Sequence, residues 1–384
     1  MRKTFQREIF MNPQEVVIGI IGGGQLAKMS SQAARKLGFT VKVLDPTPGC
    51  PASAVAEQVI GSFKNPEDVE KFARSCDIIT FDIEHVEVSP LLELQDKKII
   101  PSPQVLSLIQ NKLEQRKAYK RAGLPVPEFK EIKELAELER AIPCVQKSIK
   151  GGYDGRGTVV LKTKEDLAKA LPLPSFIEEL LDLEKELAVV VVRNEKEVAT
   201  YDVVEMVFHP QGNLLDYLFC PAQIDEKISQ MAKELAIEAV KAIEGFGLFG
   251  VELFLDKRGN LYINEIAPRP HNSGHHTIEA CYTSQFEQHI RVITGLPLGS
   301  TKLLSPAVMI NLLGEEGYYG KPIYEGLSEA LSIPGVSVHI YGKKETFPLR
   351  KMGHVTILGE TVEEALSKAK RVKSLLKVKG EVRK

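Results

Sequence analysis

An uninterrupted apolar segment close to the start of the chain restricts its fold more than any other feature. Residues 16–21, Val-Val-Ile-Gly-Ile-Ile, show no polar alternation and are rich in β-branched side chains, as in a strand buried on both faces. Three glycines at 22–24 lead into a helical pattern over 25–37, and another apolar strand follows at 41–45. Strands joined by a helix pair in parallel, so residues 1–107 are predicted to form a doubly wound α/β domain with a parallel sheet.

The pattern of elements changes after this first domain. A helical segment at 111–122 is broken by Gly-Leu-Pro-Val-Pro at 123–127. Strands are then expected at 143–148, 158–161, 176–179, 185–193 and 196–208, helices at 164–170, 225–245 and 283–294, and a hairpin at 248–255 and 260–265. From about residue 302 a smaller α+β region follows, with strands near 306–312 and 354–358 and a final basic helix.

The charge balance and the cysteines exclude several classes of protein. The 50 basic and 51 acidic residues among 384 give a net charge of -1, so neither nucleic acid nor an anionic membrane is an expected partner. The five cysteines are widely spaced and include no CxxC pair, which favours reduced thiols and a cytoplasmic location. No apolar run reaches the roughly 18 residues of a membrane span, and the first 14 residues lack the core of a signal peptide.

Two carboxylates in the predicted hairpin suggest a metal site. Glu252 lies inside a nearly continuous apolar strand, where an unpartnered carboxylate would be costly to bury. Counting back from the turn places it opposite Asn264 or Glu265, depending on a one-residue choice of register. Oxygen ligands of this kind suit Mg²⁺, which binds substrate phosphates through one or two carboxylates.

A loop stiffened by prolines follows these acids directly. It carries Arg269, His271 and Asn272, side chains able to bind a small anion. His275 and His276 come next, and for both a packed or exposed structural position is the expected one. The combination predicts a site where a phosphate donor meets an acidic reactant.

Two glycine-rich segments are candidates for phosphate binding. In residues 151–157 four glycines lie between two strands, with Lys147 and Arg156 beside them, so backbone N–H groups can approach phosphate oxygens. A flexible hairpin loop is the alternative. The glycines at 22–24, with Asp45 after the next strand, fit a nicotinamide or flavin site, a single phosphate contact, or helix packing.

Further charged residues give weaker signals. Glu178 and Glu179 end a strand whose backbone could contact an adenine edge, and Glu186 begins the next strand, where a carboxylate could bind ribose. Taken alone, these acids are typical surface charges. A basic cluster in the C-terminal region is either a solvated face or an anion pocket, and its members are Lys343, Lys344, Arg350 and Lys351.

Several of these segments together resemble a known family. The loop at 151–157, the run 176–193 and the block from Asn264 to His276, continuing to Pro297, are similar to ATP-grasp enzymes of the N5-carboxyaminoimidazole ribonucleotide synthetase family. Residues 22–26, 81–86 and 350–354 agree as well, and the resemblance covers about residues 16–375. It implies a homodimer with a three-domain ATP-grasp architecture, α/β and α+β, divided into 1–107, 108–300 with a lid subdomain at about 124–190, and 301–384.

The resemblance also implies a reaction and a set of site residues. ATP would drive the joining of bicarbonate to the amine of aminoimidazole ribonucleotide, giving ADP and phosphate. The nucleotide would be bound by Lys112, Lys147, Gly151, Gly152, Tyr153, Asp154, Gly155, Arg156, Gly157, Glu178, Glu179, Leu180, Leu181, Glu186, His209 and Asn264, and Mg²⁺ by Glu252 and Glu265. Bicarbonate would meet Arg269, His271 and Asn272, with Tyr153 and Asp154 also catalytic, and the ribonucleotide would contact Gln25, Leu26, Glu84, Lys343, Arg350 and Lys351.

Other functions fit parts of the same pattern. A formate-dependent glycinamide ribonucleotide transformylase or a biotin carboxylase shares the ATP-grasp features, but the Arg-Pro-His-Asn-Ser-Gly block at 269–274 argues against both. A nicotinamide-dependent oxidoreductase rests on the glycines at 22–24 alone. A nucleotide-binding regulator without catalysis is the third alternative.

Overall fold

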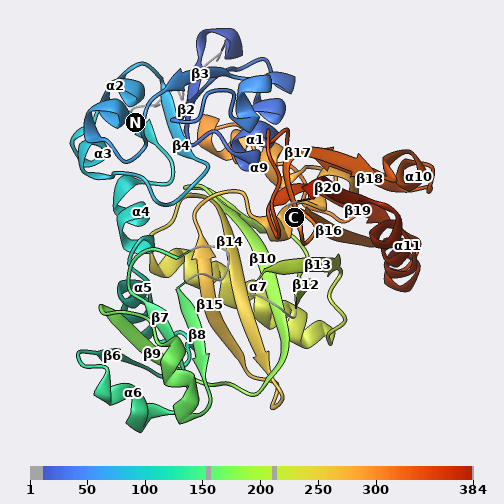
Figure 1. Cartoon of the computed structure of the whole chain (residues 1–384). Coiled ribbons are helices and arrows are strands. Elements are labelled where there is room, and N and C mark those ends of the chain that lie inside the picture. The colour runs from blue at the N-terminus through green and yellow to red at the C-terminus, as the bar shows by residue number, and fades with distance from the viewer. Residues whose placement is uncertain (1–11, 153–156, 210–213, 383–384) are drawn as a thin grey trace, which may run out of the picture.

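The computed structural model describes residues 12–152, 157–209 and 214–382 (Figure 1). Its N-terminal part is a five-stranded parallel sheet in the order β3-β2-β1-β4-β5. The strands are β1 (Val17–Ile21), β2 (Thr40–Asp45), β3 (Glu57–Ile60), β4 (Ile78–Phe81) and β5 (Lys98–Ile99). The connecting helices are α1 (Gln25–Lys36), α2 (Pro66–Arg74), α3 (Ser89–Glu93) and α4 (Pro103–Ile109). The predicted doubly wound sheet is confirmed, with α1 and α2 packed on opposite faces of β1.

Local sequence signals explain where these helices begin and end. Asn65 accepts hydrogen bonds from the amides of Glu67 at 2.8 Å and Asp68 at 3.1 Å, which caps α2 at its N-terminus. Gly38, just past α1, has a φ of +88°, a conformation that glycine adopts without strain.

A second, four-stranded sheet forms the small lobe at the lower left of Figure 1. Its order is β6-β9-β7-β8, and its elements are β6 (Phe129–Ile132), α6 (Ala136–Ala141), β7 (Cys144–Ser148), β8 (Thr158–Leu161), η3 (Lys164–Lys169) and β9 (Ser175–Glu179). The prediction of a helix at 164–170 is confirmed in position, but the segment forms the short 3-10 helix η3 and not an α-helix. The lobe has a small core of its own, built around Ile132, Leu138, Cys144 and Leu161.

The largest sheet has nine strands, which come from the second half of the chain. Its main path is β15-β14-β10-β12-β13-β16-β19-β18, with β11 paired to β10. The strands are β10 (Leu183–Arg193), β11 (Val198–Thr200), β12 (Val204–Phe208), β13 (Leu215–Cys220), β14 (Gly247–Asp256), β15 (Leu261–Ala267), β16 (Ala307–Leu313), β18 (Val336–Ile340) and β19 (Lys351–Leu358). The predicted hairpin is β14 and β15.

One expected strand of this sheet was wrong. Residues 196–208 form two strands, β11 and β12, separated by a break at 201–203. At the break Tyr201 is buried, and its hydroxyl donates a 2.8 Å hydrogen bond to the carbonyl of Thr283. A tertiary contact therefore interrupts what the sequence presents as a continuous apolar strand.

The C-terminal region shares the nine-stranded sheet, since β13 pairs with β16. Its other elements are β17 (Tyr318–Glu325), α10 (Leu327–Leu331), α11 (Val362–Leu375) and β20 (Lys377–Val382), and β17 pairs with β20 in a separate two-stranded sheet. The expected α+β content and final helix are confirmed. The domain limits at 107 and 300 stay predictions.

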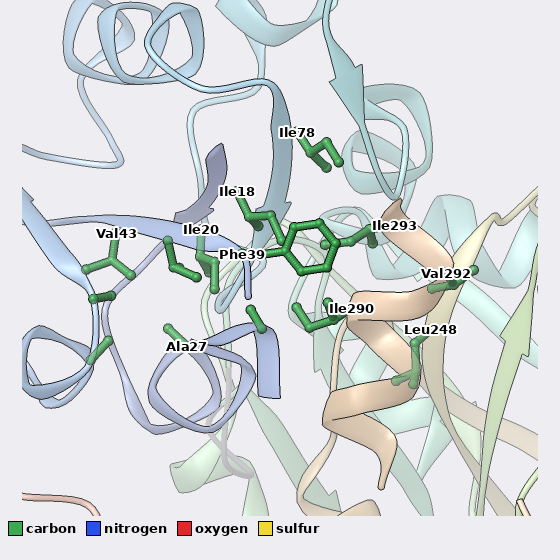
Figure 2. Packing of buried hydrophobic residues seen from close by; sticks show 14 of the residues in the cluster. Ile18, Ile20, Ala27, Phe39, Val43, Ile78, Leu248, Ile290, Val292 and Ile293 are labelled. Atoms are coloured by element: carbon green, nitrogen blue, oxygen red, sulfur yellow. The ribbon is translucent and has the colours of Figure 1, made fainter. Parts of the chain in front are cut away.

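The remaining helices pack on the parallel sheet or on the central sheet, and α9 contacts both. They are α5 (Lys112–Arg121), α7 (Glu226–Ala242), α8 (Thr277–Ala280) and α9 (Gln285–Thr294), with the short 3-10 helices η1 (Pro13–Glu15), η2 (Pro51–Ala54) and η4 (Asn272–Gly274). Figure 2 shows Ile290 of α9 close to Phe39 of the N-terminal domain and Leu248 of β14. The helix thus fixes the parallel sheet against the central one. Among the described residues, no helix is both long and apolar enough to cross a membrane.

This role of α9 predicts the effect of truncating its central side chain. Ile290→Ala is expected to lower the thermal unfolding midpoint, because removing such a buried side chain costs about 2–5 kcal/mol. Ile60→Ala, in β3 and 58% exposed, is the control for the same substitution at an exposed site and should leave the midpoint unchanged. Scanning calorimetry measures both. Equal midpoints for the two variants would contradict a joining role for α9.

Candidate active site

A cleft of about 520 Å³ opens between the small lobe, the central sheet and the N-terminal domain. Most residues that the sequence singled out line it: Gln25, Leu26, Glu84, Lys112, Lys147, Gly151, Gly152, Glu178, Glu179, Leu180, Leu181, Glu186, Glu252, Asn264, Glu265, Arg269, His271, Asn272 and Lys351. Gly157, His209, Lys343 and Arg350 are not among the lining residues. Tyr153, Asp154, Gly155 and Arg156 lie outside the described residues.

The two predicted metal ligands face each other on adjacent strands. Glu252 of β14 pairs with Glu265 of β15, and the next pair is Leu253 with Ile263, so Asn264 is the extra residue of a β-bulge. This register settles the choice that the sequence left open. The amide of Asn264 donates a 3.2 Å hydrogen bond to the carboxylate of Glu252.

The charge around this pair fits a divalent cation. Burial, then the charges of Glu265 and Glu186, raise the pKa of Glu252 to about 8. At Glu265, burial is outweighed by Lys112 and Lys147, so its pKa is lowered. At Glu252 the same two lysines also lower the pKa, but they do not offset burial and the neighbouring acids. The described residues hold no group of three or more His, Cys, Asp and Glu arranged for a metal, so substrate oxygens would have to complete the coordination.

A buried ion-pair network forms part of the cleft wall. Lys147 contacts the carboxylate of Glu178 at 2.8 Å and the side-chain carbonyl of Asn264 at 3.0 Å. Arg116 pairs with the same carboxylate and donates to the backbone carbonyl of Asn264 at 2.5 Å. Burial raises the pKa of Glu178, but the two cations outweigh it and lower the value to about 2. The side chain of Glu178 is thus held by two cations of the protein.

Arg116 was missed by the sequence analysis. It lies in the middle of α5 among other charged residues, yet its side chain is only 3% exposed. No local pattern separates it from its solvated neighbours, since both of its partners are far away in sequence. Glu186 was expected, and burial raises its pKa to about 7 on the strand next to β14.

The proline-stiffened loop forms the opposite wall. Arg269 makes a 2.6 Å ion pair with Glu84, and the ring of His271 lies 3.4 Å from Glu252 and 2.8 Å from the hydroxyl of Ser273. Both side-chain amide atoms of Asn272 are buried with no hydrogen-bond partner among the described residues. Buried amides are rarely left unpaired, so Asn272 marks a position for a polar ligand.

The loop approaches β14 closely because position 250 is glycine. A Cβ atom there would lie 2.5 Å from Cγ of His271. His275 and His276 are each 1% exposed, and the His275 ring centroid is 4.6 Å from that of His354. These two histidines are packed, as expected.

The first glycine-rich turn is engaged within the protein. Gly23 N–H donates to Asp45 at 2.9 Å, and Gly24 and Ala27 donate to Asp82 at 3.0 and 2.6 Å. Asp82 thereby caps α1. These contacts favour the packing interpretation over a dinucleotide site.

The basic cluster divides between the cleft and its surroundings. Lys351 lines the cleft. Lys343 donates to the carbonyl of Lys351 at 2.7 Å, and Lys344 donates to the carbonyl of Pro48 at 2.9 Å. Arg350 donates to the carbonyl of Glu345 at 2.8 Å and lies over the Phe347 ring.

Comparisons with known proteins agree on one family. Three family models match: a ribonucleotide synthetase preATP-grasp domain over 16–110, an ATP-grasp domain over 117–286, and a phosphoribosylaminoimidazole carboxylase C-terminal domain over 307–368. The chloroplastic phosphoribosylaminoimidazole carboxylase of Vigna aconitifolia is 42% identical over 91% of this chain, which spans 65% of that protein. The N5-carboxyaminoimidazole ribonucleotide synthase of Bacillus subtilis is 39% identical, with 91% of this chain and 93% of that protein covered.

Solved structures give the same result. The N5-carboxyaminoimidazole ribonucleotide synthetase of Thermotoga maritima is 53% identical and superposes with a TM-score of 0.89. The match covers 95% of this chain and 100% of the Thermotoga chain. The synthase of Aspergillus clavatus, in complex with ADP and 5-aminoimidazole ribonucleotide, is 34% identical with a TM-score of 0.87 and covers 94% and 99%. The chain belongs to the N5-carboxyaminoimidazole ribonucleotide synthase family.

Proposed function

We propose that this protein uses ATP to join bicarbonate to the amine of 5-aminoimidazole ribonucleotide, a step of purine biosynthesis. The observation that carries the proposal is the unpaired, buried amide of Asn272 beside Arg269 and His271, in the same cleft as the Glu252–Glu265 pair. A small anion and a metal-bound phosphate chain would fill these two adjoining positions. Family membership and a relative that binds ADP and the ribonucleotide together support the same substrates.

The chemistry requires two steps. A bicarbonate oxygen attacks the γ-phosphorus of ATP, the bond to the ADP oxygen breaks, and carboxyphosphate forms. The amine of the ribonucleotide then attacks the carboxyl carbon, directly or after CO₂ is released, and phosphate and a proton leave. No side-chain nucleophile is needed, because positioning and neutralisation of charge account for most of phosphoryl transfer.

The residues of the cleft divide between the reactants. Lys112 and Lys147 would neutralise ATP phosphates next to Gly151 and Gly152. Glu252 and Glu265, with the amide of Asn264, offer the oxygen donors that Mg²⁺ prefers and would hold this ion, whose charge would offset that of the phosphates. Burial and the charge of Glu265 both raise the pKa of Glu252, and a bound cation would offset both effects.

The acidic reactants would occupy the loop side of the cleft. Arg269, His271 and Asn272 would bind bicarbonate and the carboxyphosphate formed from it. Gln25, at the first turn of α1, and Lys351 line the wall where the ribonucleotide would bind. A homodimer stays part of the proposal by family likeness.

The direct test is ADP release by the purified protein. We expect ADP to form only when ATP, Mg²⁺, bicarbonate and aminoimidazole ribonucleotide are all present, together with a product that carries the label of ¹⁴C-bicarbonate. A coupled assay and acid-stable radioactivity measure the two products. ADP release that ignores the ribonucleotide, or ATP binding without turnover, would contradict the proposal.

The raised pKa of Glu252 predicts that binding of Mg²⁺ and nucleotide releases a proton. A carboxyl with a pKa of about 8 is mostly protonated at pH 7, whereas a metal ligand must be ionised. Affinity for the magnesium nucleotide should therefore rise with pH up to about 8 and then level off. Titration calorimetry in buffers of different ionisation enthalpy measures the proton. Glu252→Gln should abolish turnover and the released proton, and an unchanged proton count in that variant would refute the assignment.

Arg269 and Lys351, two cationic side chains that line the cleft, predict different kinetics. Arg269→Ala should lower kcat, because the anion it binds becomes the reacting group, while Lys351→Ala should raise KM for the ribonucleotide. Losing a hydrogen bond to a charged group costs roughly 1.5–3 kcal/mol, so each effect should be about tenfold or more. KM for ATP should stay nearly constant in both. If both variants weakened only ATP binding, these positions would be wrongly assigned.

A further inference from the structure

The side chain of Gln285 connects α9 to the loop that carries Arg269, His271 and Asn272. We propose that Gln285 is a positioning residue for the carboxylation step, which holds the backbone of His271 so that this loop can bind the bicarbonate-derived anion. The inference rests on the proposed function. Gln285 itself does not line the cleft, so it acts through His271.

Gln285 binds both the backbone N–H and the backbone carbonyl of His271. The side-chain oxygen of Gln285 accepts from the His271 N–H at 2.9 Å, and its amide nitrogen donates to the His271 carbonyl at 2.7 Å. The same nitrogen lies 3.2 Å from a ring nitrogen of His275. Gln285 is fully buried, so water cannot replace these bonds without a change in packing.

The backbone of Gln285 is held as well. Its N–H donates at 2.8 Å to the hydroxyl of Thr277, and this hydroxyl donates at 2.6 Å to the carbonyl of Gly274. The start of α9 and both ends of the segment 271–274 therefore form one hydrogen-bonded unit. Because α9 is also packed between two sheets, these hydrogen bonds anchor the segment 271–274 to the hydrophobic core (Figure 2).

A glycine at position 274 makes room for this side chain. A Cβ atom on Gly274 would lie 2.5 Å from Cδ of Gln285. Gly274→Ala should therefore push the glutamine amide away from His271 while leaving every hydrogen-bonding group in the chain. It provides a second route to the same disturbance, independent of any substitution at 285.

The same helix contains a structural twin of the clamp. One turn later, Gln288 donates to the carbonyl of Gly299 and accepts from its N–H, both at 2.8 Å. Gln288 is also fully buried, but neither it nor Gly299 lines the cleft. Two glutamines on one helix thus make the same pair of backbone bonds, and only one pair ends on a residue of the anion-binding loop.

The experiment compares Gln285→Met with Gln288→Met in the full chain. Both remove a buried clamp and should lower the thermal midpoint to a similar degree. Only Gln285→Met should lower kcat for ribonucleotide- and bicarbonate-dependent ADP release, by about 10- to 100-fold, because a supporting contact to a functional side chain has effects of that size. KM for ATP and the Kd of a non-hydrolysable ATP analogue should match the wild type in both variants.

Gly274→Ala and the double variant complete the test. Gly274→Ala should reproduce the kcat loss, and adding it to Gln285→Met should cost little more, since both act on one contact. Equal kcat values for Gln285→Met and Gln288→Met, or full additivity in the double variant, would overturn the inference while the proposed function stands. A wild-type protein without ribonucleotide-dependent ADP release would overturn both. If Gln285→Met does not fold, the kcat of Gly274→Ala decides alone, and a wild-type value refutes the clamp.

Discussion

The position of the cleft charges depends on one inserted residue, Asn264. Successive side chains of a regular strand point to opposite faces of the sheet, so neighbours cannot both face one cleft. Asn264 and Glu265 nevertheless both line it, because the bulge in β15 re-aims one of them. The same bulge keeps Glu252 opposite Glu265. Without it, either the amide or a carboxylate would turn away from the space between the strands.

The bulge is held from outside its own sheet. Arg116, on α5, binds the Asn264 carbonyl and the carboxylate of Glu178, and Lys147 binds that carboxylate and the Asn264 side chain. Removing one partner from such a buried group leaves a charge uncompensated, which typically costs about 3–5 kcal/mol. The network therefore connects α5, the strands β7 and β9 of the small lobe, and β15. Arg116 and Lys147 neutralise the charge of Glu178. Glu252 and Glu265 are therefore the carboxylates proposed to bind a metal.

The sequence predicted which residues gather in the cleft better than how they are held there. Periodicity and turn residues located the hairpin of Glu252 and Glu265, but a one-residue register cannot be read from an apolar run. Arg116 and Gln285 escaped notice because a helical residue whose partners are distant in sequence looks like any other polar position. Residues 201–203 misled for a similar reason, since the hydroxyl of Tyr201 binds a loop about eighty residues away. Local pattern describes elements, whereas these features are properties of tertiary contact.

The free protein is left with two complementary deficits. Burial, then the charges of Glu265 and Glu186, raise the pKa of Glu252 to about 8, whereas two cations outweigh burial at Glu178 and lower its pKa to about 2. In the same cleft, the buried amide of Asn272 has no hydrogen-bond partner within the part of the chain that the structure describes. Cations thus pair with Glu178 and Glu265, whereas at Glu252 they do not offset burial and the neighbouring acids. This unequal pairing adds no stability by itself. We attribute it to the proposed ligands, a cation at Glu252 and Glu265 and an oxyanion at Asn272.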